Sequence, residues 1–196
     1  MKALVYANGS SIIGLGHIMR TLAISSELCK RKVLVEYVVD KSDENAIKLI
    51  KNIVFNVVII NNVLEYISSF INKYDVSLID SYDINEYEVE KFYVVSRKVV
   101  YIDDLALFNS YNMDILINTS IEALNLKYVG DSKKLLGPKY AILRDEFKNI
   151  QYKMPREKVK KVLITLGGGD INNVTKLVLD LLLDYFKDKD IEYNVV

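Results

Sequence analysis

The sequence lacks several features that would place a protein in a class directly. Over 196 residues, Lys and Arg equal Asp and Glu at 26 each, so no net charge attracts nucleic acid or an anionic membrane surface. A single cysteine, Cys29, excludes an internal disulfide and is typical of proteins in a reducing compartment. We expect this thiol to be buried on an amphipathic helix, where its role would be structural rather than nucleophilic.

Long apolar runs and targeting signals are also missing. The most apolar stretch, residues 177–186, is interrupted by Asp180 and Asp184 and falls short of the roughly 20 residues of a membrane-spanning helix. Met1 leads into a short apolar segment rather than a basic and then apolar leader, so we expect no secretory signal. These absences predict a soluble, cytoplasmic protein without stable membrane insertion and without a nucleic-acid partner.

Apolar runs instead alternate with amphipathic helical patterns along the chain. The pattern predicts strands at residues 3–7, 33–39, 53–60, 76–80, 99–102 and 115–118, with helices at residues 16–30, 43–51, 63–74 and 85–97 between them. Short strands rich in Val and Ile, separated by helices, predict an α/β fold with a parallel sheet covered on both faces. Ligands bind to such sheets beyond the carboxyl ends of the strands.

A change in pattern near residue 148 predicts a second folding unit. Residues 149–160 are polar, include Pro155 and lack a clear period, whereas residues 161–166, 172–186 and 192–196 repeat the strand–helix–strand order. A single βαβ unit cannot bury both faces of a parallel sheet. We therefore expect a Rossmann-like domain over residues 1–148, a linker over 149–160, and the start of a truncated nucleotide-binding domain over 161–196.

The turn after the first strand carries the most informative local pattern. Gly14 and Gly16 precede His17, the only histidine of the chain, at the start of a predicted helix. A dinucleotide-binding fingerprint would place a third glycine where Met19 stands. Asp40 follows the second strand, where a ribose-binding acid would lie, but Met19 argues against a nicotinamide enzyme. The turn therefore favours a nucleotide-sugar site.

Helix geometry places His17 and Arg20 on one face of that helix, near its N-terminus. Free backbone N–H groups at a helix N-terminus favour an anion, and a neutral imidazole suits proton abstraction from water near pH 7. In the alternative interpretation, His17 only caps the turn and Arg20 pairs with Glu27 on the helix surface. Its place after two glycines, at the rim where ligands bind, makes His17 the preferred candidate base.

Polar residues also follow three later strands. Asp80, Ser81, Tyr82 and Asp83 would suit the polar edges of a sugar, although Asp80 alternatively caps a helix starting near Ile84. Asp103 and Asp104 are not expected to form a metal site, because no His or Cys accompanies them and alternation separates their side chains; at least one should cap a turn. A second glycine-rich turn, consisting of Gly167, Gly168, Gly169 and Asp170, could hold a phosphate on its backbone N–H groups, or simply connect domains with Asp170 as a helix cap.

Taken in order, six segments resemble a known family. They are residues 14–20 (Gly-Leu-Gly-His-Ile-Met-Arg), 80–82 (Asp-Ser-Tyr), 101–104 (Tyr-Ile-Asp-Asp), 114–118 (Asp-Ile-Leu-Ile-Asn), 137–147 (Gly-Pro-Lys-Tyr-Ala-Ile-Leu-Arg-Asp-Glu-Phe) and 166–170 (Leu-Gly-Gly-Gly-Asp). With them the chain resembles the UDP-sugar hydrolases of pseudaminic acid biosynthesis, also labelled spore-coat polysaccharide biosynthesis proteins. Those proteins are related in fold to the GT-B glycosyltransferases with two Rossmann-like domains. The chain departs from them at Tyr6 and Asn8, where they usually carry Arg and Asp.

The resemblance implies a hydrolase that needs no metal or cofactor. Water would displace UDP from the anomeric carbon of a UDP-2,4-diacetamido-2,4,6-trideoxyhexose, with His17 positioning or deprotonating that water and Tyr82 lying against the sugar. The substrate would also contact Gly14, Gly16, Arg20, Asp80 and the turn formed by Gly167, Gly168, Gly169 and Asp170. Most uridine and diphosphate contacts in such proteins lie in the rest of the second domain, so this chain is expected to bind nucleotide poorly.

Two other functions remain open at this point. A glycosyltransferase would use the same cleft with a sugar or lipid acceptor in place of water. A non-catalytic module would bind the sugar nucleotide without turnover, with a separate chain supplying the rest of the C-terminal domain. Release of free sugar without an acceptor would distinguish the hydrolase from both.

Overall fold

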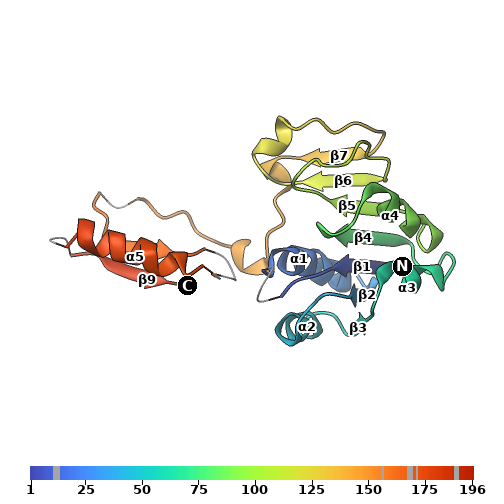
Figure 1. Cartoon of the computed structure of the whole chain (residues 1–196), viewed down its shortest axis with the longest axis horizontal. Coiled ribbons are helices and arrows are strands. Elements are labelled where there is room, and N and C mark those ends of the chain that lie inside the picture. Colours follow the sequence, from blue (N-terminus) through green and yellow to red (C-terminus); the bar gives the residue numbers. More distant parts are fainter. Residues whose placement is uncertain (11–13, 156, 167–169, 171, 188–189) are drawn as a thin grey trace.

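The computed structural model describes residues 1–10, 14–155, 157–166, 170, 172–187 and 190–196. Two sheets organise these residues (Figure 1). The larger is a seven-stranded sheet in the order β3-β2-β1-β4-β5-β6-β7, and every pairing in it is parallel. Helices flank it, so the predicted α/β class with a Rossmann-like parallel sheet is confirmed.

The elements follow one another in alternating order along the chain. The strands are β1 (Lys2–Ala7), β2 (Leu34–Val39), β3 (Asn56–Ile59), β4 (Val76–Asp80), β5 (Val99–Ile102), β6 (Ile115–Asn118), β7 (Lys133–Leu136), β8 (Lys161–Ile164) and β9 (Glu192–Val195). The α-helices are α1 (Gly16–Lys30), α2 (Glu44–Lys51), α3 (Val63–Ser68), α4 (Glu86–Lys91) and α5 (Val174–Tyr185). Single 3-10 turns occur at Phe92–Val94, Glu122–Leu124, Pro138–Tyr140 and Asp145–Phe147.

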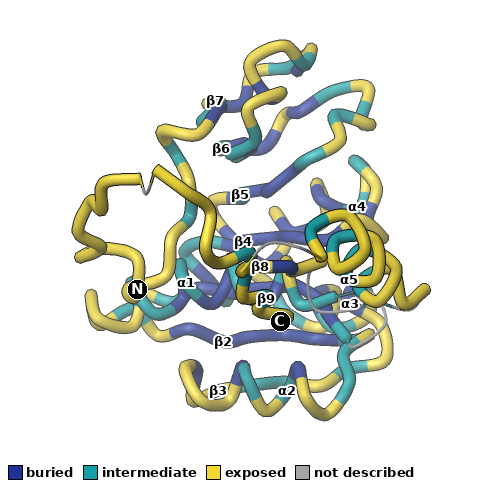
Figure 2. Tube along the Cα trace, turned by 90° about the vertical axis from the view of Figure 1, so that its left-hand side faces the viewer, coloured by how far each residue is buried: buried dark blue, intermediate teal, exposed yellow. Residues whose placement is uncertain are grey.

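Apolar side chains fill both faces of the large sheet. Leu4 and Tyr6 of β1 belong to a buried cluster that includes residues of α3 and α4, whereas Ala3 and Val5 belong to one that includes residues of α1 and α2. Successive side chains of a strand point to opposite faces, so a strand covered on both sides must be apolar throughout. The buried central strands are visible in dark blue in Figure 2.

Two expected helices are shorter than their apolar spacing predicts. The helix expected over residues 63–74 ends at Ser68, where the hydroxyl donates to the carbonyl of Leu64 at 2.7 Å and competes with the helical ladder. The chain then turns through Asn72, which has a φ of +48°. The helix expected over residues 85–97 ends at Lys91 and continues only as a 3-10 turn.

Strand predictions fail where a strand lies at or near an edge of the sheet. The strand expected over residues 53–60 is confined to β3, which is one edge. The other edge strand, β7, was not predicted, because its sequence of two lysines and two leucines lacks the apolar run of a doubly covered strand.

Cys29 is exposed, which corrects the expectation of a buried thiol. By spacing it continues the buried stripe of Leu22 and Ser25 along α1. It lies in the last turn of the helix, however, beside an open hollow lined also by Leu34 and Phe55. The buried part of this stripe therefore ends before Cys29.

The small sheet pairs β8 with β9 in parallel, with α5 between them in sequence. This is the βαβ arrangement expected for the start of a second Rossmann-like domain. Leucines remain exposed on both the helix and the sheet, at Leu163, Leu177 and Leu181. The boundaries proposed for the N-terminal domain, the linker and the C-terminal part stay predictions.

Among the described residues, no helix combines the length and apolar character needed to cross a membrane.

Candidate functional site

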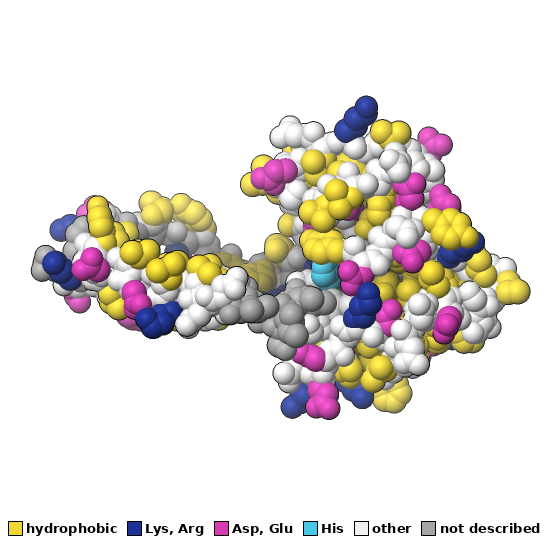
Figure 3. Space-filling view, in the orientation of Figure 1, with side chains coloured by type: hydrophobic (Ala, Val, Ile, Leu, Met, Phe, Trp, Pro, Cys, Tyr) yellow, Lys and Arg dark blue, Asp and Glu magenta, His cyan; other side chains and the backbone are white. Residues whose placement is uncertain are grey.

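The candidate site lies where the strand order of the large sheet reverses. Strand order runs from β1 outward through β2 and β3 on one side, and through β4, β5, β6 and β7 on the other. The segments after β1 and β4 therefore diverge at the carboxyl ends of these strands, where sheets of this kind bind their ligands. His17 lies in the first turn of α1, and Asp80 is the last residue of β4. Figure 3 shows the histidine side chain at the surface beside acidic and hydrophobic groups.

Glycines shape the turn that delivers His17. Gly14 has a φ of +86°, which side-chain-bearing residues rarely adopt, and it is paired with Ser10 through two backbone hydrogen bonds of 3.1 and 2.8 Å. Open space surrounds the position that a Cβ of Gly16 would take. Gly9 was not singled out from the sequence, yet a Cβ there would lie 2.9 Å from both the carbonyl oxygen of Gly14 and the side chain of Ile18.

His17 and Asp80 form a hydrogen-bonded pair. The distance from His17 Nδ1 to Asp80 Oδ1 is 2.6 Å, and the Asp80 side chain is completely buried. A carboxylate accepts hydrogen bonds only, so this contact is attractive when Nδ1 carries the proton. We infer that Nε2 keeps its lone pair and, because the imidazole is partly exposed, that a ligand can reach it.

Arg20 joins Asp80 to a second carboxylate. Its Nε and Nη2 donate to Asp80, with Nη2 at 2.6 Å from Oδ1, and its Nη1 donates to both oxygens of Asp104 at 2.9 and 2.7 Å. Burial works to lower the pKa of Arg20, but the two carboxylates raise it above its ordinary value. The alternative pairing of Arg20 with Glu27 is wrong, since Glu27 pairs with Arg31 and Lys148 instead.

Tyr82 completes the cluster from the exposed side. Its phenol donates to Asp104 Oδ2 at 2.7 Å, and its ring meets the imidazole of His17 edge to face, with ring centres 4.3 Å apart. Burial, followed by the hydrogen bond to Asp104, raises the pKa of Tyr82 to about 12. The side chain remains 57% exposed, so one aromatic face is available beside the histidine.

The cluster formed by His17, Arg20, Asp80, Tyr82 and Asp104 holds two carboxylates, Asp80 and Asp104, and one guanidinium, that of Arg20. The buried carboxylate on Nδ1 would hold the imidazolium that forms, as in a general-base pair.

The alternative roles as turn and helix caps hold for Asp103 but not for Asp80. Asp103 accepts from the backbone N–H of Ala106 and the phenol of Tyr128, each at 2.8 Å, so it caps a turn as one interpretation predicted. Asp80 does not cap the following helix, since Asn85 does so with a reciprocal bond from Glu88. Asp104 is the functional partner that sequence reasoning missed; alternation with Asp103 indicated that their side chains would diverge, but not what Asp104 would meet.

Asp40 is occupied by neighbours from the same chain. It accepts from the Asn8 side chain at 2.6 Å and from the Tyr6 phenol at 3.1 Å. Burial and then the charge of Asp40 raise the pKa of Tyr6 above its ordinary value. These contacts account for the residues at positions 6 and 8, where the resembling family carries a charged pair.

The second glycine-rich turn is described only at its end. Gly167, Gly168 and Gly169 lie outside the described residues. Asp170 accepts from the backbone N–H groups of Val174 and Thr175 at 2.7 and 2.8 Å. These bonds, chiefly those from Thr175, lower the pKa of Asp170 and satisfy two N–H groups in the first turn of α5. The N-cap position itself belongs to Asn173, which corrects the expectation that Asp170 is the N-cap residue.

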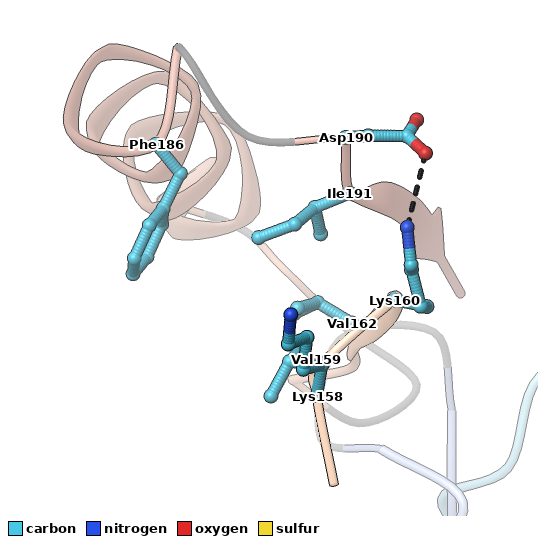
Figure 4. A pocket seen from close by; sticks show the side chains of 7 residues that line it. All are labelled: Lys158, Val159, Lys160, Val162, Phe186, Asp190 and Ile191. Atoms are coloured by element: carbon cyan, nitrogen blue, oxygen red, sulfur yellow. Dashed lines mark hydrogen bonds and ion pairs between the residues drawn. The ribbon is translucent and has the colours of Figure 1, made fainter. Parts of the chain in front are cut away.

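A concavity lies in the small sheet. Its volume is about 610 Å³, and Val162, Ile191 and Phe186 line it together with Lys160 and Asp190, which pair at 3.2 Å (Figure 4). Its charged groups are this ion pair and Lys158, and none of the residues of the His17 cluster lines it. No group of three or more His, Cys, Asp or Glu side chains suited to a metal ion occurs among the described residues.

Comparison with known proteins adds similarity without a function. No family model matches the chain. The chain is similar over its whole length to MJ1062 of Methanocaldococcus jannaschii, an uncharacterized protein, with 35% identity over 208 aligned residues. The alignment covers 100% of this chain but 42% of that relative, so the chain spans less than half of the relative's length.

Proposed function

We propose that the chain belongs to a hydrolase that releases UDP from a UDP-linked diacetamido-trideoxyhexose. The observation that carries this proposal is the His17–Asp80 pair at the strand-order reversal, with Tyr82 beside it and with no hydrogen-bond partner for Nε2 of the imidazole among the described residues. The resemblance of the six sequence segments supports the choice of a sugar nucleotide as substrate.

The chemistry follows from the orientation of His17. Nε2 takes a proton from a water molecule as the water oxygen forms a bond to the anomeric carbon of the sugar. The bond from that carbon to the diphosphate oxygen breaks, and its electron pair leaves with UDP. Asp80 holds Nδ1–H and stabilises the imidazolium, which then returns its proton to solvent.

Other residues of the site have supporting roles. The exposed face of Tyr82 suits contact with the sugar ring, and the open space beside Gly16 admits a ligand close to the backbone. Arg20 and Asp80, which we expected to contact substrate, have their polar atoms directed at one another and at neighbouring residues. Their contacts support a role in orienting His17 rather than a direct contact with the sugar.

Charge favours a division of labour within the site. Arg20 is the cation closest to His17 in the described cluster, and it is paired with two carboxylates. A diphosphate therefore gains little from it and needs donors elsewhere, such as the glycine-rich segment at residues 167–170 that the sequence analysis singled out. The large sheet would supply the base and the sugar contacts.

UDP release from UDP-2,4-diacetamido-2,4,6-trideoxyaltrose tests this proposal. The chain and a longer version, extended beyond residue 196, would be compared with their His17→Asn and Asp80→Asn variants. We expect free sugar without any acceptor, and a fall of about 10²- to 10⁴-fold in kcat for His17→Asn. Tight substrate binding without turnover in the longer version would contradict the hydrolase and favour a binding module.

A glycosyltransferase is the second candidate because the rim is apolar on one side. Leu105, Leu107 and Ile121 lie after the carboxyl ends of β5 and β6, and all three are exposed. His17 also lies beyond the carboxyl end of its strand, β1. Such exposed apolar side chains would suit a lipid-linked acceptor better than they suit water. A requirement for an acceptor in the UDP-release assay would favour this candidate.

A further inference from the structure

We propose that Asp104 is a positioning residue of this site, which holds the ring of Tyr82 against His17 and leaves the phenol oxygen free only to accept a hydrogen bond from substrate. The inference rests on the proposed function for its consequence in turnover. Its structural part concerns contacts between side chains and can be tested without substrate.

Asp104 is the only one of the five cluster residues that contacts both Tyr82 and Arg20 through hydrogen bonds in the described structure. Its Oδ2 accepts from the Tyr82 phenol at 2.7 Å and from Arg20 Nη1 at the same distance. Arg20 is in turn held by Asp80, which is buried. The carboxylate of Asp104 therefore ties the exposed aromatic ring to the buried end of the cluster.

This tie fixes where the aromatic ring lies. Tyr82 belongs to the loop after β4, is more than half exposed, and meets His17 only through an edge-to-face ring contact. Such a contact contributes about 1 kcal/mol and does not by itself fix one rotamer of an exposed side chain. The charge-assisted bond from the phenol to Asp104 supplies the second point of attachment.

The same bond sets the polarity that Tyr82 shows to a ligand. A phenol has a single O–H donor, and here that O–H donates its hydrogen bond to Asp104. The lone pairs of the phenol oxygen remain, so the group recognises a donor. An amide N–H or a hydroxyl of an acetamido sugar would fit, whereas a carbonyl oxygen placed there would meet another acceptor.

The test uses the fact that the chain has one histidine. Nuclear Overhauser contacts between the imidazole protons of His17 and the ring protons of Tyr82 can be assigned without ambiguity among histidines. They would be measured in the parent chain and in Asp104→Ala, Asp104→Asn and Tyr82→Phe. Tyr93→Phe is the matched control, because Tyr93 is also exposed and donates to an aspartate, Asp114, at 2.8 Å elsewhere in the chain.

We expect the contacts in the parent and in Tyr93→Phe, and at least a threefold loss of their intensity in Asp104→Ala and Tyr82→Phe. Asp104→Asn keeps the size of the side chain and serves as a second variant if Asp104→Ala fails to fold. The intensity of its contacts should lie between those of the parent and of Asp104→Ala. Contacts of undiminished intensity in both Asp104 variants would overturn the proposal, as would their absence from the parent.

Turnover in the longer version separates this inference from the proposed function. Tyr82→Phe should raise KM about fivefold, since it loses a ground-state hydrogen bond to substrate, and should also lower kcat, because it also breaks the hydrogen bond to Asp104. Asp104→Ala should lower kcat about tenfold, because His17 and the sugar contact lose their alignment. If the Overhauser contacts behave as expected but no variant or parent releases UDP, the positioning role stands and the hydrolase fails.

Discussion

The guanidinium of Arg20 lies between the carboxylates of Asp80 and Asp104 and donates hydrogen bonds to both. Asp80 is completely buried, whereas Asp104 is partly exposed. A buried carboxylate without a cation nearby is strongly destabilising, so the ion pair with Arg20 offsets the cost of burying Asp80 beside His17. The carboxylate of Asp80, which holds His17, is therefore stabilised by Arg20, a residue one helical turn after His17 on α1.

Removal of Arg20 should therefore destabilise the fold. We expect Arg20→Ala to lower the free energy of unfolding by about 3 kcal/mol, since Asp80 would lose its cation while remaining buried. Urea unfolding followed by circular dichroism measures the change. Arg31→Ala is the control, because Arg31 forms an exposed pair with Glu27 worth less than about 0.5 kcal/mol. Equal losses in the two variants would contradict a special role for the Arg20 pairs.

Two glycines near the site should differ in how much stability they lose on replacement by alanine. Gly9→Ala places a Cβ 2.9 Å from the Gly14 carbonyl and from Ile18, so we expect a loss of about 2 kcal/mol in unfolding free energy. Gly16→Ala meets open space at the first residue of α1 and should change stability by less than about 1 kcal/mol. Thermal melts of both variants would show this difference; a larger loss for Gly16→Ala would contradict the packing around the turn.

Glu36 should make the fold sensitive to acid. Burial alone would raise its pKa, but hydrogen bonds from Tyr66, Tyr74 and Lys73 outweigh burial and lower it to about 2. Because the folded pKa lies below the unfolded value of 4.5, the stabilisation is fully present above about pH 4.5 and is lost as the pH falls toward 2. The loss attributable to this group amounts to about 3 kcal/mol at most.

Urea midpoints measured between pH 7 and pH 2.5 test the role of Glu36. A Glu36→Gln variant should be less stable at pH 7 and should lose less stability on acidification than the parent. Glu122→Gln changes an exposed residue and serves as the control, with a pH profile like that of the parent. Parallel profiles for the parent and Glu36→Gln would show that another carboxylate is responsible.

The thiol of Cys29 should react without denaturation. Because Cys29 is exposed in the last turn of α1, a disulfide reagent should modify one thiol per folded chain. Cys29→Ser should abolish the reaction and leave the circular dichroism spectrum unchanged. A thiol that reacts only in denaturant would restore the buried position expected from its helical spacing.

Sequence patterns predicted the parts of the fold that are buried on both faces. The bounds of α1, β4, β5 and β6 were predicted exactly as they occur, because a continuous apolar run or a regular helical stripe specifies each of them. Pattern failed for β7, which is an edge strand with two lysines. At the end of α3, serine side chains compete for backbone carbonyls, and apolar spacing carries no signal of that competition.

The sequence singled out most residues of the candidate site but did not indicate which of them contact one another. The glycines, the lone histidine and the strand ends indicated His17, Asp80 and Tyr82. Which carboxylate meets Arg20 depends on the pairing of β4 with β5, and no local pattern specifies that pairing. Neighbours brought together by sheet topology therefore remained hidden until the strand order was known.

We expect the contacts around His17 to form late during folding. His17 and Asp80 are separated by 63 residues, and Arg20 and Asp104 by 84, so neither contact forms before distant strands have docked. Closing such long loops is slow compared with forming α1 itself. In a partly folded chain, α1 could be formed while His17 still lacks its contact with Asp80. Activity that depends on His17 would then require that β1 and β4 have paired.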